Sequence, residues 1–135
     1  QVGDQYYWER AIGIASPPAQ VTGMQLGTGT TAVAKTGAGA GLVTLVAASL
    51  QALDATFPTS SLVSASRRAT WKVTYAAGVA TATGIAEAVL VNQATGTQTI
   101  APAASTISRA LISPVINKTA SDTLALTWTH DLLGA

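Results

Sequence analysis

With 135 residues and no cysteine, the chain is long enough for one compact domain with its own core, and it offers no disulfide framework or thiolate ligand. Seven Lys and Arg against six Asp and Glu give a net charge of +1, and the only adjacent basic pair is Arg67 and Arg68, so nucleic acid is not an expected partner. Charged residues make up 10% of the chain, against roughly 25% in an ordinary soluble domain, so small uncharged residues must cover much of the surface, which favours a homo-oligomer or multi-copy assembly.

The first predicted element spans residues 6–14, as a short helix or as an extended arm docked through Tyr7, Trp8 and Ile12. Aromatic side chains make good anchors in protein interfaces, so this segment is a candidate contact surface. Tryptophan is also the largest packing unit, and we predict that all three lie in the core: Trp8, Trp71 and Trp128.

Residues 21–26 are predicted to form a strand, and a Gly-rich stretch follows that reads GTGTTAVAKTGAGAG over residues 27–41. Residues 42–53 fit a helix or a strand about equally well. We favour a strand, because residues 42–46 are apolar and β-branched and no capping box precedes them. The apolar run over residues 37–53 is short and weakly hydrophobic for a membrane span, so we expect no membrane partner.

Two segments of the second half, residues 69–76 and 123–131, carry the period-two alternation of half-buried strands. One face of the first segment collects Trp71, Val73 and Tyr75. One face of the second collects Leu124, Leu126, Trp128 and His130.

Two further strands are predicted over residues 85–92 and 107–116. In the first, Glu87 falls on the same face as three apolar residues and must find a partner or an edge: these are Ile85, Val89 and Val91. In the second, Pro114 cannot donate to a ladder of hydrogen bonds, so it predicts a sheet edge or a bulge.

Several short strands separated by turns, with no alternating helices, predict a mainly β protein. We expect an antiparallel β-sandwich or a jelly-roll-like single domain. Residues 21–135 would form this domain, and residues 1–20 would form an N-terminal arm or docking segment.

The Gly-rich stretch contains a near match to a phosphate-binding P-loop, GTTAVAKT over residues 29–36. The motif requires glycine directly before the lysine, and Ala34 stands there. Further glycines after Thr36 would also weaken the helix that a P-loop opens, by about 1 kcal/mol each. We therefore interpret the stretch as a surface loop that needs small residues because other backbone passes close to it.

No catalytic, cofactor or metal site is predicted. His130 and Asp131 are adjacent, and adjacent strand residues face opposite sides, so they do not form a general-base dyad. The scattered carboxylates show no spacing typical of metal ligands. Arg67, Arg68 and Arg109 flank or interrupt strands, and we interpret them as solvated residues or as partners of another subunit. The chain is therefore not expected to be an enzyme.

Four stretches resemble a family of small structural proteins of tailed bacteriophages, described as virion, head-associated or tail-associated proteins. They cover most of the chain: WERAIGIASPPAQVTGMQLGTGTTAVAKTGAGAGLVT (residues 8–44), ALDATFP (52–58), TWKVTYAAGVATATGIAEAVLVNQ (70–93) and ISRALISPVINKTASDTLALTWTHDLLGA (107–135). The resemblance implies a place in the virion, assembled in the host cytoplasm, and it supplies no catalytic residue.

The low charge and the resemblance together predict a capsid decoration or cement protein that binds neighbouring capsid subunits or other virion proteins. Two alternatives remain open: a structural protein of the tail, neck or a fibre, and a carbohydrate-binding β-sandwich module that stacks exposed aromatic rings on sugars. The candidate inter-subunit contacts are Tyr6, Tyr7, Trp8, Arg10 and His130.

Overall fold

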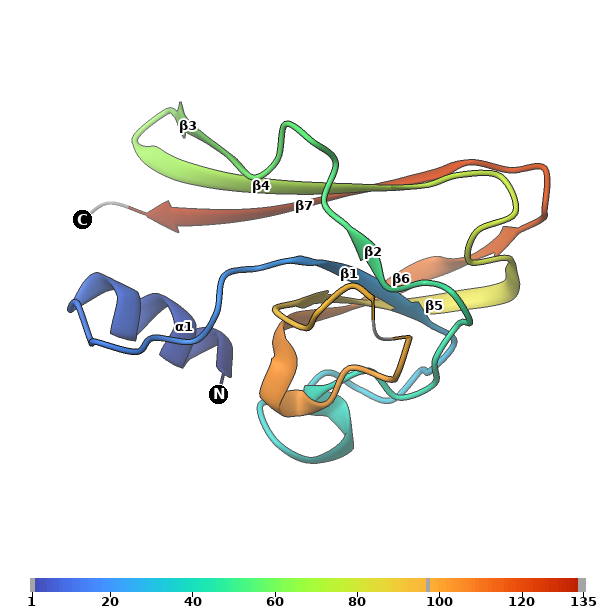
Figure 1. The fold of residues 1–135 in the computed structure, drawn as a ribbon, viewed down its shortest axis with the longest axis horizontal. Coiled ribbons are helices and arrows are strands. Elements are labelled where there is room, and N and C mark those ends of the chain that lie inside the picture. Colours follow the sequence, from blue (N-terminus) through green and yellow to red (C-terminus); the bar gives the residue numbers. More distant parts are fainter. Residues whose placement is uncertain (1, 97, 134–135) are drawn as a thin grey trace.

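A computed structural model describes residues 2–96 and 98–133 of the chain (Figure 1). Within these residues the fold is mainly β, as predicted, with two antiparallel sheets that face each other as a small β-sandwich. The larger sheet has the order β2-β1-β5-β6, with bounds β1 Gly23–Gly27, β2 Gln51–Ala52, β5 Ala82–Val91 and β6 Thr106–Lys118. The smaller sheet has the order β3-β4-β7, with bounds β3 Thr59–Val63, β4 Ser66–Tyr75 and β7 Leu124–Leu133.

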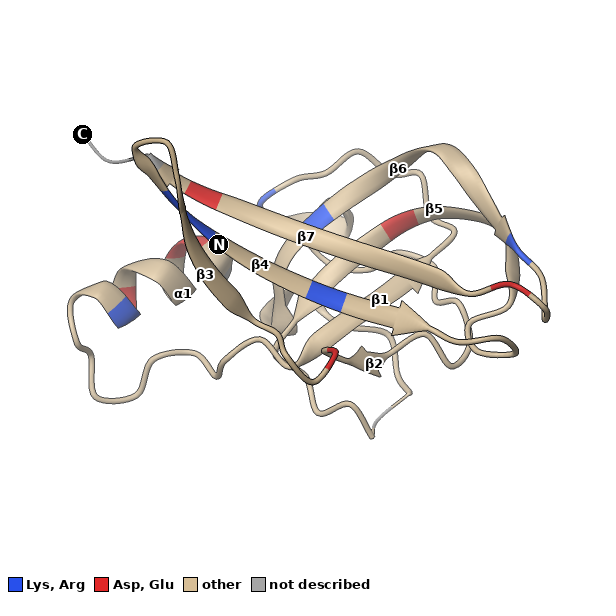
Figure 2. Ribbon diagram, turned by 90° about the horizontal axis from the view of Figure 1, so that it is seen from above, with Lys and Arg blue, Asp and Glu red and all other residues tan. Residues whose placement is uncertain are grey.

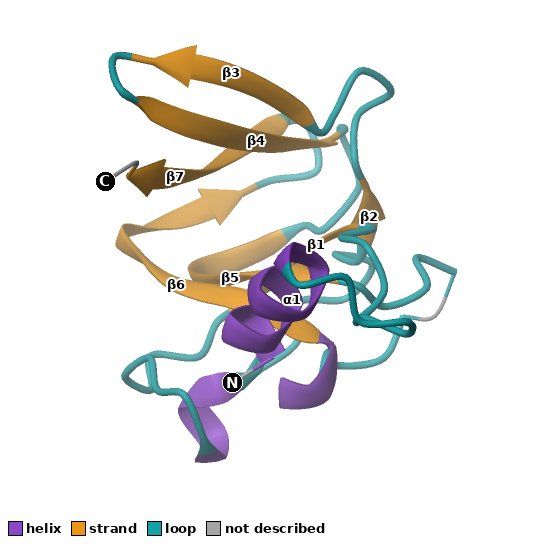
Figure 3. Cartoon of the chain, turned by 90° about the vertical axis from the view of Figure 1, so that its left-hand side faces the viewer, coloured by secondary structure: helices purple, strands orange, loops and turns teal. Residues whose placement is uncertain are grey.

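Three short helices complete the described part of the fold, and Figure 3 shows them (purple) in the lower half of the view, with the smaller sheet at the top. They are α1 Val2–Ala11 and two 3₁₀ helices, η1 Gly37–Ala40 and η2 Ala103–Ser105. No helix among the described residues is long and apolar enough to cross a membrane. Figure 2 shows the charged residues scattered over the ribbon.

The smaller sheet confirms the two clearest strand predictions. β4 and β7 pair antiparallel over ten residues without a break in register, from Ser66 opposite Leu133 to Tyr75 opposite Leu124. Alternation places one row of each strand toward the larger sheet. The row of β4 is buried, at 4% exposure or less: Trp71, Val73 and Tyr75.

The main core fills the space between the sheets. Its buried members include residues of β1, β4, β5 and β6, and residues of β7 pack against it from the edge. A second, smaller cluster lies on the other side of the larger sheet, where loops cover it: Leu42, Leu50, Val89, Val91 and Ala101. The larger sheet is therefore covered on both faces.

Because both faces of the larger sheet are covered, the residues of β5 from Ile85 to Val91 are all buried. The prediction that Ile85 shares a face with Val89 and Val91 was wrong. Ile85 belongs to the core between the sheets, whereas the two valines belong to the cluster under the loops. A register shift between Ile85 and Glu87 changes the alternation at this point.

The strand predicted over residues 42–53 was also wrong in most of its length. Only Gln51 and Ala52 pair with β1, and Leu45 makes a single bridge to Gly27. The remaining apolar residues form a loop that covers the sheet, and its backbone is satisfied elsewhere; Val46 N–H, for example, donates to the Leu26 carbonyl. Apolar content alone does not separate such a covering loop from a strand.

Strand β6 is an edge of the larger sheet, and Pro114 lies in a bulge, as predicted. Ile85 pairs with Ile116 and Glu87 pairs with Leu111, so the intervening β6 residues outnumber those of β5. Extra residues on one strand bend it away from a regular ladder. The missing N–H of proline is tolerated at such a place.

Candidate functional site

Helix α1 confirms the helical alternative for the N-terminal segment. It packs against β6 and η2, and it lies below the end of β7 (Figures 1 and 3). Its two tyrosines, Tyr6 and Tyr7, are half-buried and meet edge to face, with ring centroids 5.2 Å apart. Tyr6 packs against the core between the sheets. The helix is therefore docked on the sandwich through its aromatic residues.

Tyr7 and His130 form a hydrogen bond that joins α1 to β7. His130 also accepts a hydrogen bond at Nε2 from the indole Nε1–H of Trp128, at 2.9 Å. The imidazole meets the ring of Trp71 edge to face, with centroids 5.2 Å apart. His130 is therefore the centre of an aromatic cluster that holds the arm.

The protonation states in this cluster follow from its geometry. An indole nitrogen only donates, so His130 Nε2 must be unprotonated, and the neutral ring carries its proton on Nδ1 toward the Tyr7 oxygen. Burial lowers the pKa of His130, which favours this neutral form. Burial, together with the neighbouring Tyr6, raises the pKa of Tyr7 to about 12.

Arg10 fixes the far end of the helix within the chain. Its guanidinium lies over the Tyr6 ring, 4.9 Å from the centroid, and Nη2 donates to the Pro18 carbonyl at 2.7 Å. Four of the predicted contact residues thus serve contacts inside the chain, and their inter-subunit role stays a prediction: Tyr6, Tyr7, Arg10 and His130.

Trp8 was wrongly predicted to lie in the core, because 67% of its surface is exposed. Ile12 follows it by four positions and is 53% exposed, and Ile14 is 47% exposed. Side chains four apart in a helical segment are neighbours, and Ile12 N–H donates to the Trp8 carbonyl at 3.0 Å. We call Trp8, Ile12 and Ile14 the arm patch.

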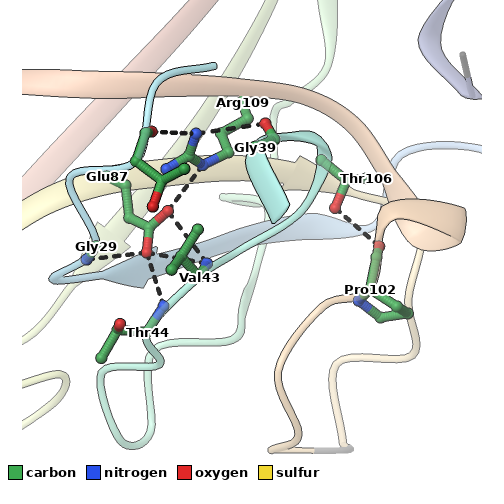
Figure 4. Close-up of polar contacts among 9 residues, drawn as sticks. Gly29, Gly39, Val43, Thr44, Glu87, Pro102, Thr106 and Arg109 are labelled. Atoms are coloured by element: carbon green, nitrogen blue, oxygen red, sulfur yellow. Dashed lines mark hydrogen bonds and ion pairs between the residues drawn. The ribbon is translucent and has the colours of Figure 1, made fainter. Parts of the chain in front are cut away.

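A buried ion pair between Arg109 and Glu87 organises the Gly-rich loop (Figure 4). The interpretation of Arg109 as a solvated or inter-subunit residue was therefore wrong. Arg109 Nε lies 2.8 Å from Glu87 Oε2, and the two side chains are 1% and 0% exposed. Arg109 Nη1 also donates to the carbonyls of Thr31 and Gly39. The position of Glu87 on an apolar strand face was the sequence signal for such a partner.

Glu87 Oε1 accepts three backbone N–H groups of the loop, from Gly29, Val43 and Thr44, at 2.9–3.1 Å. We call Glu87, Arg109 and these loop contacts the loop clasp. A buried carboxylate needs such donors to offset its desolvation. The clasp therefore fixes the Gly-rich loop to β5 and β6 by its backbone.

Close approaches by backbone and by Glu87 explain two glycines of the stretch, and they confirm its interpretation as a loop that other backbone passes closely. A Cβ added at Gly41 would lie 2.8 Å from the Ala103 nitrogen, and one at Gly29 would lie 2.5 Å from Glu87 Oε1. The residues of the P-loop near match continue into the 3₁₀ helix η1 rather than an α-helix. Within this near match, the backbone N–H of Gly29 donates to the Glu87 carboxylate of the chain itself.

A cavity of about 680 Å³ lies between this loop, α1 and η2. Lys35 and Asp4 form an ion pair of 2.6 Å at its exposed border, and Arg109 is already bound to Glu87. No group of three or more His, Asp or Glu side chains among residues 2–96 and 98–133 is arranged to hold a metal ion. His130 and Asp131 do face opposite sides, since Asp131 pairs with Arg68 at 2.7 Å on the exposed surface.

Comparison of the chain with models of protein families, with curated protein sequences and with solved structures finds no match.

Proposed function

We propose that this chain is a structural protein of a virion, and specifically a capsid decoration protein that binds neighbouring capsid subunits in many copies. The arm patch is the observation that carries the proposal: three large apolar side chains are exposed on α1 and on the segment directly after it, and the Tyr7–His130 contact joins this helix to β7. Exposed tryptophan on an ordered element is typical of interface anchors. The resemblance to phage structural proteins supports a virion as the setting.

The composition supports the same role. The chain has few charges, and its best-defined ones are used internally, in the loop clasp and in pairs such as Arg68 with Asp131. A surface of small uncharged residues is buried against a neighbour at low desolvation cost. Binding in many copies would then combine individually weak contacts into stable attachment to the capsid.

The carbohydrate-binding alternative requires exposed aromatic rings that share a groove. Tyr6 borders a small cavity of about 280 Å³ together with Trp71, and Trp8 does not line it. This arrangement favours an assembly role over sugar stacking.

The test is incorporation of Trp8→Ser and Ile12→Ser variants into particles of the virus that encodes the chain, measured by quantitative mass spectrometry of purified heads and tails. We expect the unmodified chain in heads and at least a tenfold loss of the Trp8→Ser variant. Val115→Ser is the matched control, because Val115 is 52% exposed on β6, away from the arm patch. Normal occupancy of both arm variants would overturn the arm-patch mechanism, and recovery with tails would favour the tail alternative.

A further inference from the structure

The four edges of the two sheets are not equally protected against pairing with another strand. β2 has two residues and β3 has five, and the β6 edge contains Pro114 and breaks in register. Such short strands, prolines and bulges are the devices by which proteins block edge-to-edge association. β7 has none of them: it has ten residues, no Pro or Gly, and an unbroken register with β4.

The side chains of β7 are also left incompletely covered. Leu124, Leu126 and Trp128 face the core but are only half-buried, whereas their partners on β4 are 4% exposed or less. A strand added beside β7 would cover this row. β7 has no strand partner except β4 among the described residues.

The hydrogen bonds of β4 show which backbone groups of β7 point away from β4. Lys72 C=O and Thr74 N–H both bond Asp54, at 2.9 Å, on the side of β4 that faces β3. In an antiparallel ladder the N–H and C=O of one residue point to the same side, and the next residue points to the other. Trp71 and Val73 therefore point toward β7.

Their partners on β7, Trp128 and Leu126, consequently direct their backbone groups to β4. The residues that alternate with them along β7 direct their backbone groups away from β4: Ala125, Thr127 and Thr129. These side chains are exposed, small and uncharged. The one charged side chain of the strand, Asp131, is already paired with Arg68.

We propose that β7 pairs antiparallel with β7 of a second copy of this chain, around a two-fold axis near Trp128, so that two three-stranded sheets become one continuous sheet. A strand paired with its own copy forms a closed interface in which both edges are satisfied at once. With the axis at Trp128, Asp131 lies opposite Ala125 of the second copy, so no like charges oppose each other. The inference deepens the proposed structural role and rests on it for its biological setting.

Amide hydrogen exchange on the unmodified chain tests the pairing directly. At high concentration we expect Thr127 and Thr129 N–H to be protected, and we expect this protection to disappear on dilution. Leu126 and Trp128 N–H bond β4 and should stay protected throughout, which provides an internal control. The proposal is overturned if the Thr127 and Thr129 amides exchange freely at a chain concentration of about 1 mM. It is also overturned if these amides stay protected when the chain is a monomer.

Mass in solution, measured by light scattering after size exclusion, gives the second test. We expect twice 13.6 kDa for the unmodified chain and a monomer for Thr127→Pro, which removes an outward N–H and leaves the bonds to β4 intact. Thr127→Val keeps the N–H and should remain a dimer. A Thr127→Pro dimer with native circular dichroism contradicts the pairing, and if that variant does not fold, the exchange data decide. A monomeric chain that still enters virions would overturn the pairing and leave the proposed function intact.

Discussion

The indole Nε1–H of Trp128 donates to Nε2 of His130 at 2.9 Å, so the imidazole on β7 must be neutral for the Tyr7 contact and the Trp128 contact to exist together. A proton added at Nε2 would face another N–H. The contact between Trp128 and His130 on β7 is thereby linked to the charge of this histidine.

Acidification from pH 7 to pH 5 should weaken the fold through His130. Burial lowers the folded pKa of His130 below its ordinary value of 6.5, so the folded state binds fewer protons than the unfolded state. The stabilisation that neutral His130 provides is present above pH 6.5 and is lost as the pH falls toward the folded pKa. The free energy of unfolding should fall by less than about 1.4 kcal/mol per pH unit, because the side chain is partly exposed and solvent screens it.

The measurement is the midpoint of thermal unfolding against pH, with His130→Gln as the control that cannot titrate. Asp4, Asp122 and Asp131 have pKa values lowered from 3.8, so their stabilisation is lost only in more acidic solution. A pH dependence that is identical in His130→Gln between pH 7 and pH 5 would contradict the assignment.

Breaking the loop clasp should cost far more than breaking an exposed ion pair. Arg109→Met leaves the Glu87 carboxylate buried without its cation, and we expect the free energy of unfolding to fall by about 3–5 kcal/mol. Arg68→Met removes the partner of Asp131 at the surface and should cost about 0–1 kcal/mol. Urea unfolding at pH 7 compares the two variants. Equal losses of stability would show that the buried ion pair contributes no more than the exposed one.

Glycine substitutions in and outside the loop clasp should differ in the same way. A Cβ at Gly29 would lie 2.5 Å from Glu87 Oε1 and 2.7 Å from the Val43 Cβ, whereas one at Gly96 meets nothing within 4 Å. We expect Gly29→Ala to cost about 1–3 kcal/mol, and Gly96→Ala to stay within about 0.5 kcal/mol of the unmodified chain. The midpoints of denaturant unfolding measure both losses, provided that the dependence of the unfolding free energy on denaturant is unchanged. A Gly29→Ala variant as stable as the unmodified chain would show that the loop shifts to accept the extra methyl group.

Truncation of two tryptophans should change the free energy of unfolding by very different amounts. Trp71→Ala empties the core and should cost about 3–5 kcal/mol. Trp8→Ala removes an exposed side chain of the arm patch and should change the free energy of unfolding by less than about 0.5 kcal/mol. A large loss of stability for Trp8→Ala in urea would assign Trp8 a packing role rather than a contact role.

The sequence predicted the strands whose two faces differ in burial. β4 and β7 alternate cleanly because one face meets the core and the other meets solvent, and period-two patterning reports that difference. The same reasoning misplaced Ile85, because loops cover the second face of β5 and a register shift changes its alternation. The strand prediction for residues 42–53 was wrong for a related reason, because a loop that covers a sheet is as apolar as a strand within it.

The candidate site was only partly predictable. The aromatic residues of the arm were recognised, but a helix with no clear apolar stripe does not show which of them docks, so Trp8 was placed in the core and is exposed. Glu87 required a partner, and the partner was twenty-two positions away on β6. Such a pairing depends on strand order and register, which local patterns do not contain.

The contacts of the loop clasp have a consequence for how the chain is made. They join residues 22 to 78 positions apart, and a ribosome delivers those residues in order. The Gly-rich loop cannot close on Glu87 and Arg109 until both β5 and β6 have emerged, and non-local contacts of this kind form slowly. The loop that covers the outer face of the larger sheet therefore reaches its final position only after most of the chain has been synthesised.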